Sequence, residues 1–334
     1  MRDVARTAGV HPGTVSRVLN PATRPLVSPR TADRVERAAR DLGYSLNPIA
    51  SGLKTRRTFS VGVVIPDLTN PLFPPIIRGM EEVLDRAGYT TLVASTDGDP
   101  ERERQRLRTL TARQVDGFLV ATAERGRASF AELVSAGMAV VLVNRTVEHG
   151  GVFAVVPDDR KGLALAVAHL VELGHRRIAH LAGPQRLSTG RLRYRGFLEA
   201  MDDHGLAVDR RDVVHADAFT EAAGALAARR LLRLRSRPTA IVAANDLLAL
   251  GVYTALQSTG LRCPDDVSVI GFNGMPFTDR FSPPLSTILI PHAQIGARAA
   301  ELLLERIDDP HATPQTLMFE PSLLARASTA PPRA

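Results

Sequence analysis

The chain has 334 residues, 44% of them hydrophobic, which is enough for a small module beside a larger folded domain. It has no run of 18 apolar residues and no apolar leader, so we expect no membrane contact, no export and a cytoplasmic location. The single cysteine, Cys263, excludes an internal disulfide and a multi-cysteine metal site.

The net charge of +7 lies entirely in the first part of the chain. Residues 1–57 hold 11 Lys/Arg against 4 Asp/Glu, while the remainder has 31 of each sign. A basic head on a neutral body is typical of nucleic-acid binding. A solvated basic face or a surface-binding arm would give the same charge, so charge alone leaves these alternatives open.

The N-terminal residues predict three short helices. Residues 3–8 and 12–19 each repeat apolar side chains at helical spacing, and Gly9 turns the chain between them. Ser28 can cap a third helix that ends at Gly43. Two short helices joined by a glycine turn predict a helix-turn-helix, whose second helix enters the major groove of DNA.

Two longer runs make this prediction specific. The first reads D-V-A-x-x-A-G-V-x-x-x-T-V-S-R-V-L-N over residues 3–20, and the second reads V-S-x-x-T-x-x-R-V-x-x-A-A-x-x-L-G-Y-x-x-N over 27–47. Together they resemble the DNA-binding head of the lactose-repressor/galactose-repressor family. This resemblance implies a transcription regulator, expected to be a repressor, that binds a pseudo-palindromic duplex operator as a homodimer.

The residues expected to contact DNA follow from this resemblance. Family members often carry base-reading side chains where this chain has Pro12 and Gly13, and neither of these can hydrogen-bond through a side chain. We therefore expect base reading to shift to Arg17 and His11. The resemblance implies contacts with the phosphate backbone, which position the head without specifying sequence, for Thr14, Ser16 and Asn20.

Residues 47–57 connect the head to the body. Asn47 can cap and Pro48 can start a short helix, which would be marginal alone, and a plain linker is the alternative. The segment resembles the family's hinge helix. That resemblance implies that Leu53 wedges into a base step of the minor groove and that Lys54 lies near phosphates.

Beyond residue 58, apolar strands alternate with amphipathic helices. Strands are expected over 61–66, 91–95, 117–122, 140–144, 178–183, 213–216, 241–245 and 267–272. Helices are expected over 76–88, 101–114, 162–173, 195–205, 247–260 and 294–307. This alternation predicts an α/β body of parallel sheets with helices on both faces.

A repeated pattern divides the body into two lobes. The segment R-G-M-E-E-V-L-D-R-A-G at 78–88 is echoed by R-G-F-L-E-A-M-D-D-H-G at 195–205. We therefore predict two doubly wound parallel-sheet lobes behind an all-α helix-turn-helix head. The expected divisions are the head, 1–46; the hinge, 47–57; the body, 58–330; lobe 1, about 58–157 and 287–315; and lobe 2, about 158–286 and 316–330.

The body resembles the same family, whose body is similar to periplasmic sugar-binding proteins. The resemblance is carried by the segments 67–73, 169–179, 244–251, 264–272 and 325–329. It implies a small-molecule effector, expected to be a sugar, that binds between the lobes and controls operator binding. The chain ends without an extra apolar heptad helix, so we expect a dimer and not a tetramer.

The candidate effector site consists of polar and aromatic residues at strand ends, where ligands of such sheets bind. They are Asn70, Phe73, Asn144, Thr189, Arg193, Phe219, Asn245 and Asn273. Amides and a guanidinium suit hydroxyls or a carboxylate, and the aromatic rings suit an apolar face. The family usually has Asp where this chain has Asn273, which predicts a different ligand preference.

Each candidate also has a purely structural interpretation. Phe73 and Phe219 could belong to the core, Asn245 could cap a helix, and Arg193 could be a solvated helix residue. The residue types and spacing of a metal site also occur once in the sequence, at His169, Glu172 and His175. Helical geometry rotates the last well away from the first, so we expect structural roles and no metal.

An α/β sugar- or nucleotide-processing enzyme with an appended DNA-binding head is the alternative function. The sequence lacks G-x-S-x-G, H-E-x-x-H, G-x-x-x-x-G-K-[ST] and G-x-G-x-x-G, and shows no obvious acid–base pair. We therefore expect neither catalysis nor a cofactor. A pure sugar-binding protein is a second alternative, excluded mainly by residues 1–57.

Overall fold

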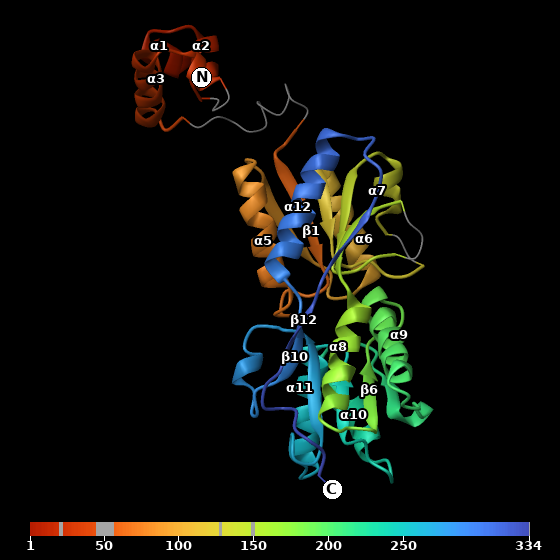
Figure 1. Ribbon diagram of the computed structural model, residues 1–334. Coiled ribbons are helices and arrows are strands. Elements are labelled where there is room, and N and C mark those ends of the chain that lie inside the picture. Colours follow the sequence, from red (N-terminus) through yellow and green to blue (C-terminus); the bar gives the residue numbers. More distant parts are fainter. Residues whose placement is uncertain (20–22, 45–56, 127–128, 148–150, 334) are drawn as a thin grey trace. The chain divides into compact units, whose positions relative to one another are not determined.

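The computed structural model describes residues 1–19, 23–44, 57–126, 129–147 and 151–333 (Figure 1). These residues belong to two compact units, Met1–Phe59 and Ser60–Ala334. No helix in the described part of the chain is long and apolar enough to cross a membrane. The predicted contacts of Asn20, Leu53 and Lys54, and the hinge helix, lie outside the described residues.

The head contains the three predicted helices and one short 3-10 turn. Their bounds are α1 (Arg2–Ala8), α2 (Pro12–Leu19), η1 (Arg24–Leu26) and α3 (Pro29–Asp41). Nine small apolar side chains form its core: Val4, Ala5, Ala8, Val15, Val18, Ala32, Val35, Ala38 and Ala39. Ser28 occupies the N-cap position of α3, but its hydroxyl donates to Thr31 Oγ1 instead of accepting a backbone N–H.

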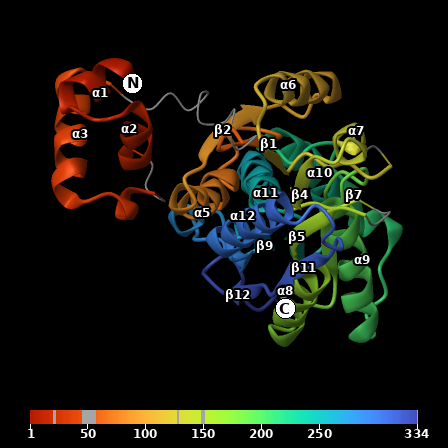
Figure 2. The same ribbon diagram turned by 90° about the horizontal axis from the view of Figure 1, so that it is seen from above.

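The first lobe is built on a six-stranded parallel sheet with strand order β11-β5-β4-β3-β1-β2. The strands are β1 (Ser60–Ile65), β2 (Thr90–Ser95), β3 (Gly117–Val120), β4 (Ala139–Val143), β5 (Phe153–Pro157) and β11 (Thr316–Phe319). Its helices are α5 (Phe73–Arg86), α6 (Pro100–Ala112), α7 (Ala131–Ser135) and α12 (His292–Asp308). Figure 2 shows α5 and α12 on one side of β1 and α6 on the other.

The inner strands of this lobe, such as β1, β3 and β4, are apolar on both faces because helices cover both. Val63 and Ile65 of β1 pack in the core cluster that contains Met80 of α5, whereas Val64 packs with Leu107 of α6. Successive side chains of a strand point to opposite faces, so a doubly covered strand must be apolar at every position. This explains the continuous apolar runs in the sequence.

The second lobe repeats this plan with strand order β12-β10-β9-β8-β6-β7. The strands are β6 (Ile178–Ala182), β7 (Val213–His215), β8 (Ala240–Ala243), β9 (Ser268–Asn273), β10 (Ser286–Leu289) and β12 (Ser322–Leu324). The helices are α8 (Asp159–Glu172), α9 (Ser188–Asp203), α10 (Glu221–Leu232) and α11 (Asp246–Ser258), with two short turns, η2 (Arg210–Asp212) and η3 (Thr278–Arg280). All pairs in this sheet are parallel except that of β12 with β10.

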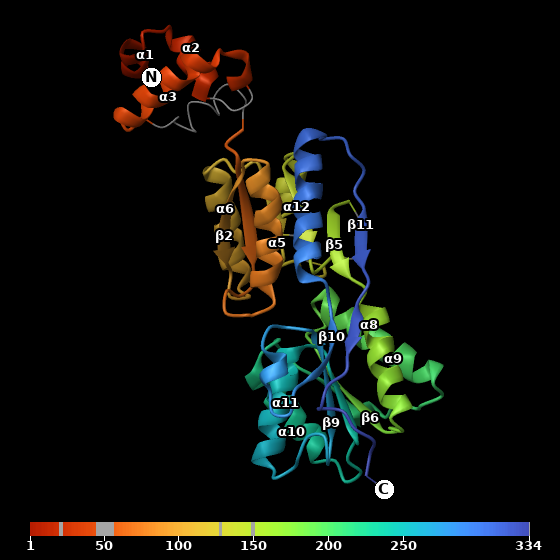
Figure 3. The same cartoon turned by 60° about the vertical axis from the view of Figure 1, so that its left-hand side comes forward.

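The predicted fold class is confirmed, but the lobe boundaries near 287 and 316 need correction. Strand β10 belongs to the sheet of lobe 2 through Leu289, and β11 belongs to that of lobe 1 through Phe319. Figure 3 shows these C-terminal crossings in blue beside β5 and β10. The prediction failed because it missed β5, β10, β11 and β12, and the helices α7 and α10 were missed as well.

The two histidines with metal-like spacing hold the C-terminal segment against lobe 2. His169 Nε2 lies 2.9 Å from Thr329 Oγ1, and His175 Nε2 lies 2.9 Å from the Ala330 carbonyl oxygen. His175 Nδ1 lies 2.8 Å from Thr239 Oγ1. Burial is the largest cause that lowers the pKa of both rings, so they act as neutral hydrogen-bonding groups.

Helices α5 and α12 approach each other through glycines. A Cβ atom at Gly296 would lie 1.9 Å from the Ile76 carbonyl oxygen, and one at Gly79 would lie 2.1 Å from that of Ala293. Both carbonyl oxygens belong to the backbone, which cannot move aside as a flexible side chain can. The sequence places glycine at these positions because nothing larger fits.

We predict that Gly296→Ala lowers the free energy of unfolding by about 1–3 kcal/mol, because overpacking outweighs the helix propensity that alanine adds. Urea unfolding followed by circular dichroism would measure the change. The adjacent variant Ala297→Ser, which leaves the helix contact intact, serves as the control. An unchanged midpoint for Gly296→Ala would refute the close approach.

Candidate functional site

A cavity lies between the two lobes where strands of both sheets end. Its inner part, here called the inner cavity, is lined by residues that follow β1, β4, β6, β8 and β9 and by one residue after β7. They are Asn70, Leu72, Phe73, Asn144, Arg145, Thr189, Arg193, Phe219, Asn245 and Asn273. All eight residues of the candidate effector site are among these ten, so the structure brings the whole predicted set together.

Arg193 is buried at the centre of this set. Its Nε donates to Asp159 Oδ1 at 2.8 Å, its Nη1 donates to the Ala244 carbonyl oxygen at 2.6 Å, and its guanidinium lies 3.8 Å from the centre of the Phe272 ring. Only 2% of its surface is exposed, so it is not a solvated helix residue. Burial raises the pKa of Asp159 to about 6 although Arg193 opposes the shift, so the pair is ionised at pH 7.

Four polar atoms that line the inner cavity are buried without a hydrogen-bond partner among the described residues. They are Asn144 Oδ1, Arg145 Nε, Thr189 Oγ1 and Asn273 Oδ1. Buried polar groups nearly always have partners, and each missing bond costs about 1–3 kcal/mol. Their concentration in one cavity indicates a place where a polar molecule supplies the missing bonds.

The two asparagines adopt an unusual backbone conformation. Asn144 has φ +63° and Asn273 has φ +111°, so both lie in the region that favours glycine. Asparagine tolerates this region better than most residues, although strain of this kind still costs free energy and is concentrated at functional sites. The ends of β4 and β9 therefore hold the side-chain amides of Asn144 and Asn273 in place at some cost in folding free energy.

Asp246 holds the strand end that carries Asn273. Its carboxylate accepts from Met275 N–H at 2.8 Å and from Thr287 Oγ1 at 2.6 Å. It is fully buried, and burial raises its pKa to about 7 although both hydrogen bonds oppose the shift. The neighbouring Asn245 caps α11, because its Oδ1 accepts from Leu248 N–H at 2.8 Å, which leaves its amide nitrogen to donate to a ligand.

The aromatic candidates differ in their surroundings. Phe73 is 2% exposed and packs in the core of lobe 1 while one edge borders the inner cavity. Phe219 is only partly buried, and a Cβ atom at Gly183 would lie 2.3 Å from its ring. Glycine directly after β6 therefore leaves room for the edge of the Phe219 ring, which lines the cavity.

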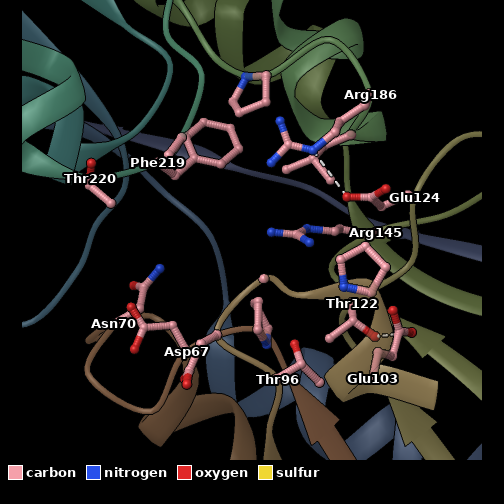
Figure 4. A pocket seen from close by; sticks show the side chains of 17 residues that line it. Asp67, Asn70, Thr96, Glu103, Thr122, Glu124, Arg145, Arg186, Phe219 and Thr220 are labelled. Atoms are coloured by element: carbon pink, nitrogen blue, oxygen red, sulfur yellow. Dashed lines mark hydrogen bonds and ion pairs between the residues drawn. The ribbon is translucent and has the colours of Figure 1, made fainter. Parts of the chain in front are cut away.

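The outer cavity adjoins the inner one and has a volume of about 310 Å³. The two share Asn70, Arg145 and Phe219. Its other charged lining residues are Asp67, Asp97, Glu103, Glu124 and Arg186 (Figure 4). No histidine, cysteine or lysine lines either cavity in the described part of the chain.

Polar contacts join the two lobes at the rim of the outer cavity. Arg186 of lobe 2 pairs with Glu124 of lobe 1 at 3.0 Å, and Arg125 Nη1 donates to the Gln185 carbonyl oxygen at 2.8 Å. Thr146 N–H donates to Ser188 Oγ at 3.0 Å. These contacts close the cleft between the lobes on this side.

The candidate effector set omits Leu72 and Arg145 of the inner cavity and most of the outer cavity. Arg145 directly follows Asn144 at the same strand end, so its position could have selected it. The absence of a protein partner for its Nε is visible only in three dimensions. The outer cavity is formed by loops from both lobes, and no sequence pattern brings those loops together.

The helix-turn-helix presents its predicted contacts on the side of α2 away from the core. Arg17 and His11 are exposed, whereas Thr14 and Ser16 are partly buried. His11 Nδ1 accepts from Gly13 N–H at 3.1 Å, which leaves its Nε2 as the ring's donor in the neutral form. Arg17 makes no ion pair with any described residue, so its guanidinium is available to a partner.

Comparison with known proteins gives the family. The model described as bacterial regulatory proteins, lacI family, matches residues 1–47, and that of a periplasmic binding protein-like domain matches 167–329. The chain is 34% identical over 330 residues to the HTH-type transcriptional repressor PurR of Photobacterium profundum, with 98% of each protein covered. The chain belongs to the lacI family of bacterial regulatory proteins.

Solved structures of the lacI family agree with this assignment. The chain matches a transcriptional regulator CelR–cellobiose complex with a TM-score of 0.76 and 32% identity, and 98% of each chain is covered. It matches the lac repressor dimer bound to operator and the anti-inducer ONPF with a TM-score of 0.86 and 27% identity, again over 98% of each chain. The predicted resemblance is confirmed: this lacI-family chain is a DNA-binding transcription regulator, and the enzyme alternative is not favoured.

Titration of Asp246 gives a test of the buried network. Its folded-state pKa of about 7 lies above the unfolded value of about 3.9, so its contribution to stability is complete below the unfolded pKa and is lost as pH rises through 7. We predict that wild-type protein loses about 1–2 kcal/mol relative to Asp246→Asn between about pH 6 and pH 8.

Urea unfolding of both proteins at several pH values would measure this difference. Histidine titration is common to the two proteins and cancels in the comparison. Parallel stability curves over that range would show that Asp246 keeps its ordinary pKa.

Proposed function

We propose that this regulator is a repressor that binds a pseudo-palindromic operator as a homodimer. The lac repressor structure it resembles is a dimer bound to operator, which supports the same arrangement here. One head has a core of only nine small side chains and offers a small surface, so two heads on two half-sites provide the area that specific binding needs. His11 and Arg17 would read bases, Thr14, Ser16 and Asn20 would contact phosphates, and Leu53 and Lys54 would engage the minor groove.

We propose further that a small polyhydroxylated molecule, a sugar, binds in the inner cavity and controls operator binding. The observation that carries this proposal is the set of four unpartnered polar atoms at the inner cavity. Sugar hydroxyls both donate and accept, so one ring can satisfy the amides of Asn144 and Asn273 and the hydroxyl of Thr189. The cellobiose complex of a relative over the same fold supports this class of ligand.

The aromatic side chains support the same ligand class. The partly buried ring of Phe219 would cover the apolar face of a sugar, as the edge of Phe73 would from the other lobe. A purine could stack on the same rings, so nucleosides are the main competitor. The unpartnered amide oxygens of Asn144 and Asn273 and the hydroxyl of Thr189 favour a sugar, which has many hydroxyls, over a planar nucleobase, which has few hydrogen-bonding groups.

The cavity supports a sensor and not an enzyme. The fully buried carboxylates Asp159 and Asp246 line neither cavity and are held by Arg193 and by two hydrogen bonds, respectively, so neither is placed to act as an acid or base on a ligand. We propose that the protein catalyses no reaction, needs no cofactor and works in the cytoplasm, where the DNA is.

Arg17 gives a test of operator reading. We predict that Arg17→Ala costs about 1–3 kcal/mol on the cognate operator and much less on a random duplex of the same length, because a base contact is sequence-specific. Fluorescence anisotropy with labelled duplexes would measure both affinities. Equal losses on the two duplexes would make Arg17 a phosphate contact.

Thr189 gives the cleanest test of the effector site. Its hydroxyl is buried and has no partner in the described protein, so Thr189→Val removes no internal hydrogen bond. We predict that Thr189→Val weakens binding of the effector, identified by calorimetry against sugars and nucleosides, by about tenfold, since a missing hydrogen bond costs about 1–3 kcal/mol. Folding and operator affinity without ligand should be unchanged.

Thr254→Val, on α11 outside both cavities, is the matched control and should leave effector affinity unaltered. Arg193→Ala is a poorer test because it would strand the buried Asp159 carboxylate. If Thr189→Val binds the effector with native affinity, the pocket has been placed wrongly. If no sugar or nucleoside binds the wild-type protein, the effector proposal is overturned.

A further inference from the structure

Most charged side chains around the two cavities have a partner within the protein, either an opposite charge or a hydrogen-bond donor. Arg193 pairs with Asp159, and Arg186 pairs with Glu124. Asp97 pairs with Arg102 at the exposed rim. The remaining carboxylates accept hydrogen bonds: Asp67 Oδ1 from Thr69 N–H at 2.7 Å, and Glu103 Oε1 from Thr122 Oγ1 at 2.6 Å.

Arg145 is the exception. Among the charged residues lining the cavities in the described part of the chain, it alone makes neither an ion pair nor a hydrogen bond, and its buried Nε has no partner. It lines both cavities, and Figure 4 shows its guanidinium pointing into the space between Arg186 and Thr122. The one charged lining residue without a partner among the described residues therefore lies where the cavities meet.

Arg145 keeps its positive charge at neutral pH. Burial, the largest cause, and the nearby Arg186 and Arg193 lower its pKa to about 10, although Glu124 and Glu103 oppose the shift. This value is still well above neutrality, so the guanidinium is charged at pH 7. Glu124 is already committed to Arg186, and Glu103 makes no ion pair with Arg145.

We propose that the effector is an anionic sugar, one that carries a carboxylate or a phosphate, and that Arg145 binds this group. The inference rests on the proposed function, because it assigns the ligand class of the same cavity. The sugar ring would occupy the inner cavity, against Phe219 and the two orphaned amides. The anionic group would lie at the junction with the outer cavity, whose volume of about 310 Å³ leaves room for a phosphate or a second unit.

A neutral hydroxyl would be a poorer match for Arg145. A guanidinium presents several donors in one plane and binds carboxylate or phosphate through two parallel hydrogen bonds. A hydroxyl accepts one such bond and brings no opposite charge to the partly buried guanidinium. The neighbouring carboxylates do not compete for Arg145, because each already has a partner in the protein.

Calorimetry with the full-length protein tests this inference. The probes are neutral sugars, glucose and galactose, each with its uronate and its 6-phosphate. We predict that at least one anionic sugar binds about tenfold or more tightly than its neutral parent, as expected for a charge-assisted hydrogen bond. The uronate and phosphate arms distinguish the two sources of the charge.

The variant Arg145→Gln should abolish this preference by weakening binding of the anionic sugar more than binding of its neutral parent, because only the anionic sugar loses a charge-assisted pair of hydrogen bonds. Arg145→Lys, which keeps the charge but not the planar pair of donors, should retain part of it. Arg195→Gln, an exposed arginine on α9 that lines neither cavity, is the matched control and should bind like wild type.

The outcomes separate this inference from the proposed function. If a neutral sugar binds as tightly as its anionic forms, or if Arg145→Gln weakens both alike, the anionic ligand is refuted while the sugar-controlled repressor stands. If no ligand in the panel of sugars and nucleosides, with these six included, binds or changes operator affinity, the sugar proposal and this inference are both overturned.

Discussion

The buried guanidinium of Arg193 organises the effector-binding body. From α9 it contacts Asp159 at the start of α8, the last carbonyl oxygen before Asn245, and the Phe272 ring of β9, so one side chain joins the start of α8 to the ends of β8 and β9. A charge removed from water needs a partner and further hydrogen bonds, and this one has both. The same contacts place Asn245 and Asn273 at the cavity wall, so a residue that holds the lobe together also positions the groups that would meet a ligand.

Around that fixed centre the protein leaves other polar groups unpaired. Four buried atoms at the inner cavity have no partner in the described chain, and two of their residues have positive φ angles. A fold that needed only stability would not retain such costs, which amount to about 1–3 kcal/mol for each unsatisfied group. A ligand that completes these bonds gains the corresponding free energy without reorganising the site. Because the bonds come from both lobes, the ligand stabilises the arrangement in which the lobes are close, and this difference is what a regulator can transmit.

The spacing of apolar residues predicted much of the fold, and the positions of polar residues at strand ends predicted much of the candidate effector site. Helix α2 begins and ends where expected, and all eight candidate effector residues line one cavity. The errors have physical causes. Strands β10, β11 and β12 are three or four residues long and follow the last predicted strands, so the crossings between lobes were placed a few residues too early. The sequence also does not show which charged side chains pair with each other. Glu124 and Arg186 are far apart in the chain, and the structure is needed to show that Glu124 pairs with Arg186 while Arg145 Nε has no partner among the described residues.

The central claim is that occupancy of the interlobe cavity and operator binding are coupled. Linkage requires this coupling to be reciprocal: the factor by which the effector changes operator affinity must equal the factor by which the operator changes effector affinity. Two titrations of the wild-type protein measure both, one of labelled operator with and without saturating effector, and one of effector with and without saturating operator. The account predicts equal factors of about 5 or more. A ligand that fills the cavity and leaves both affinities unchanged would contradict it.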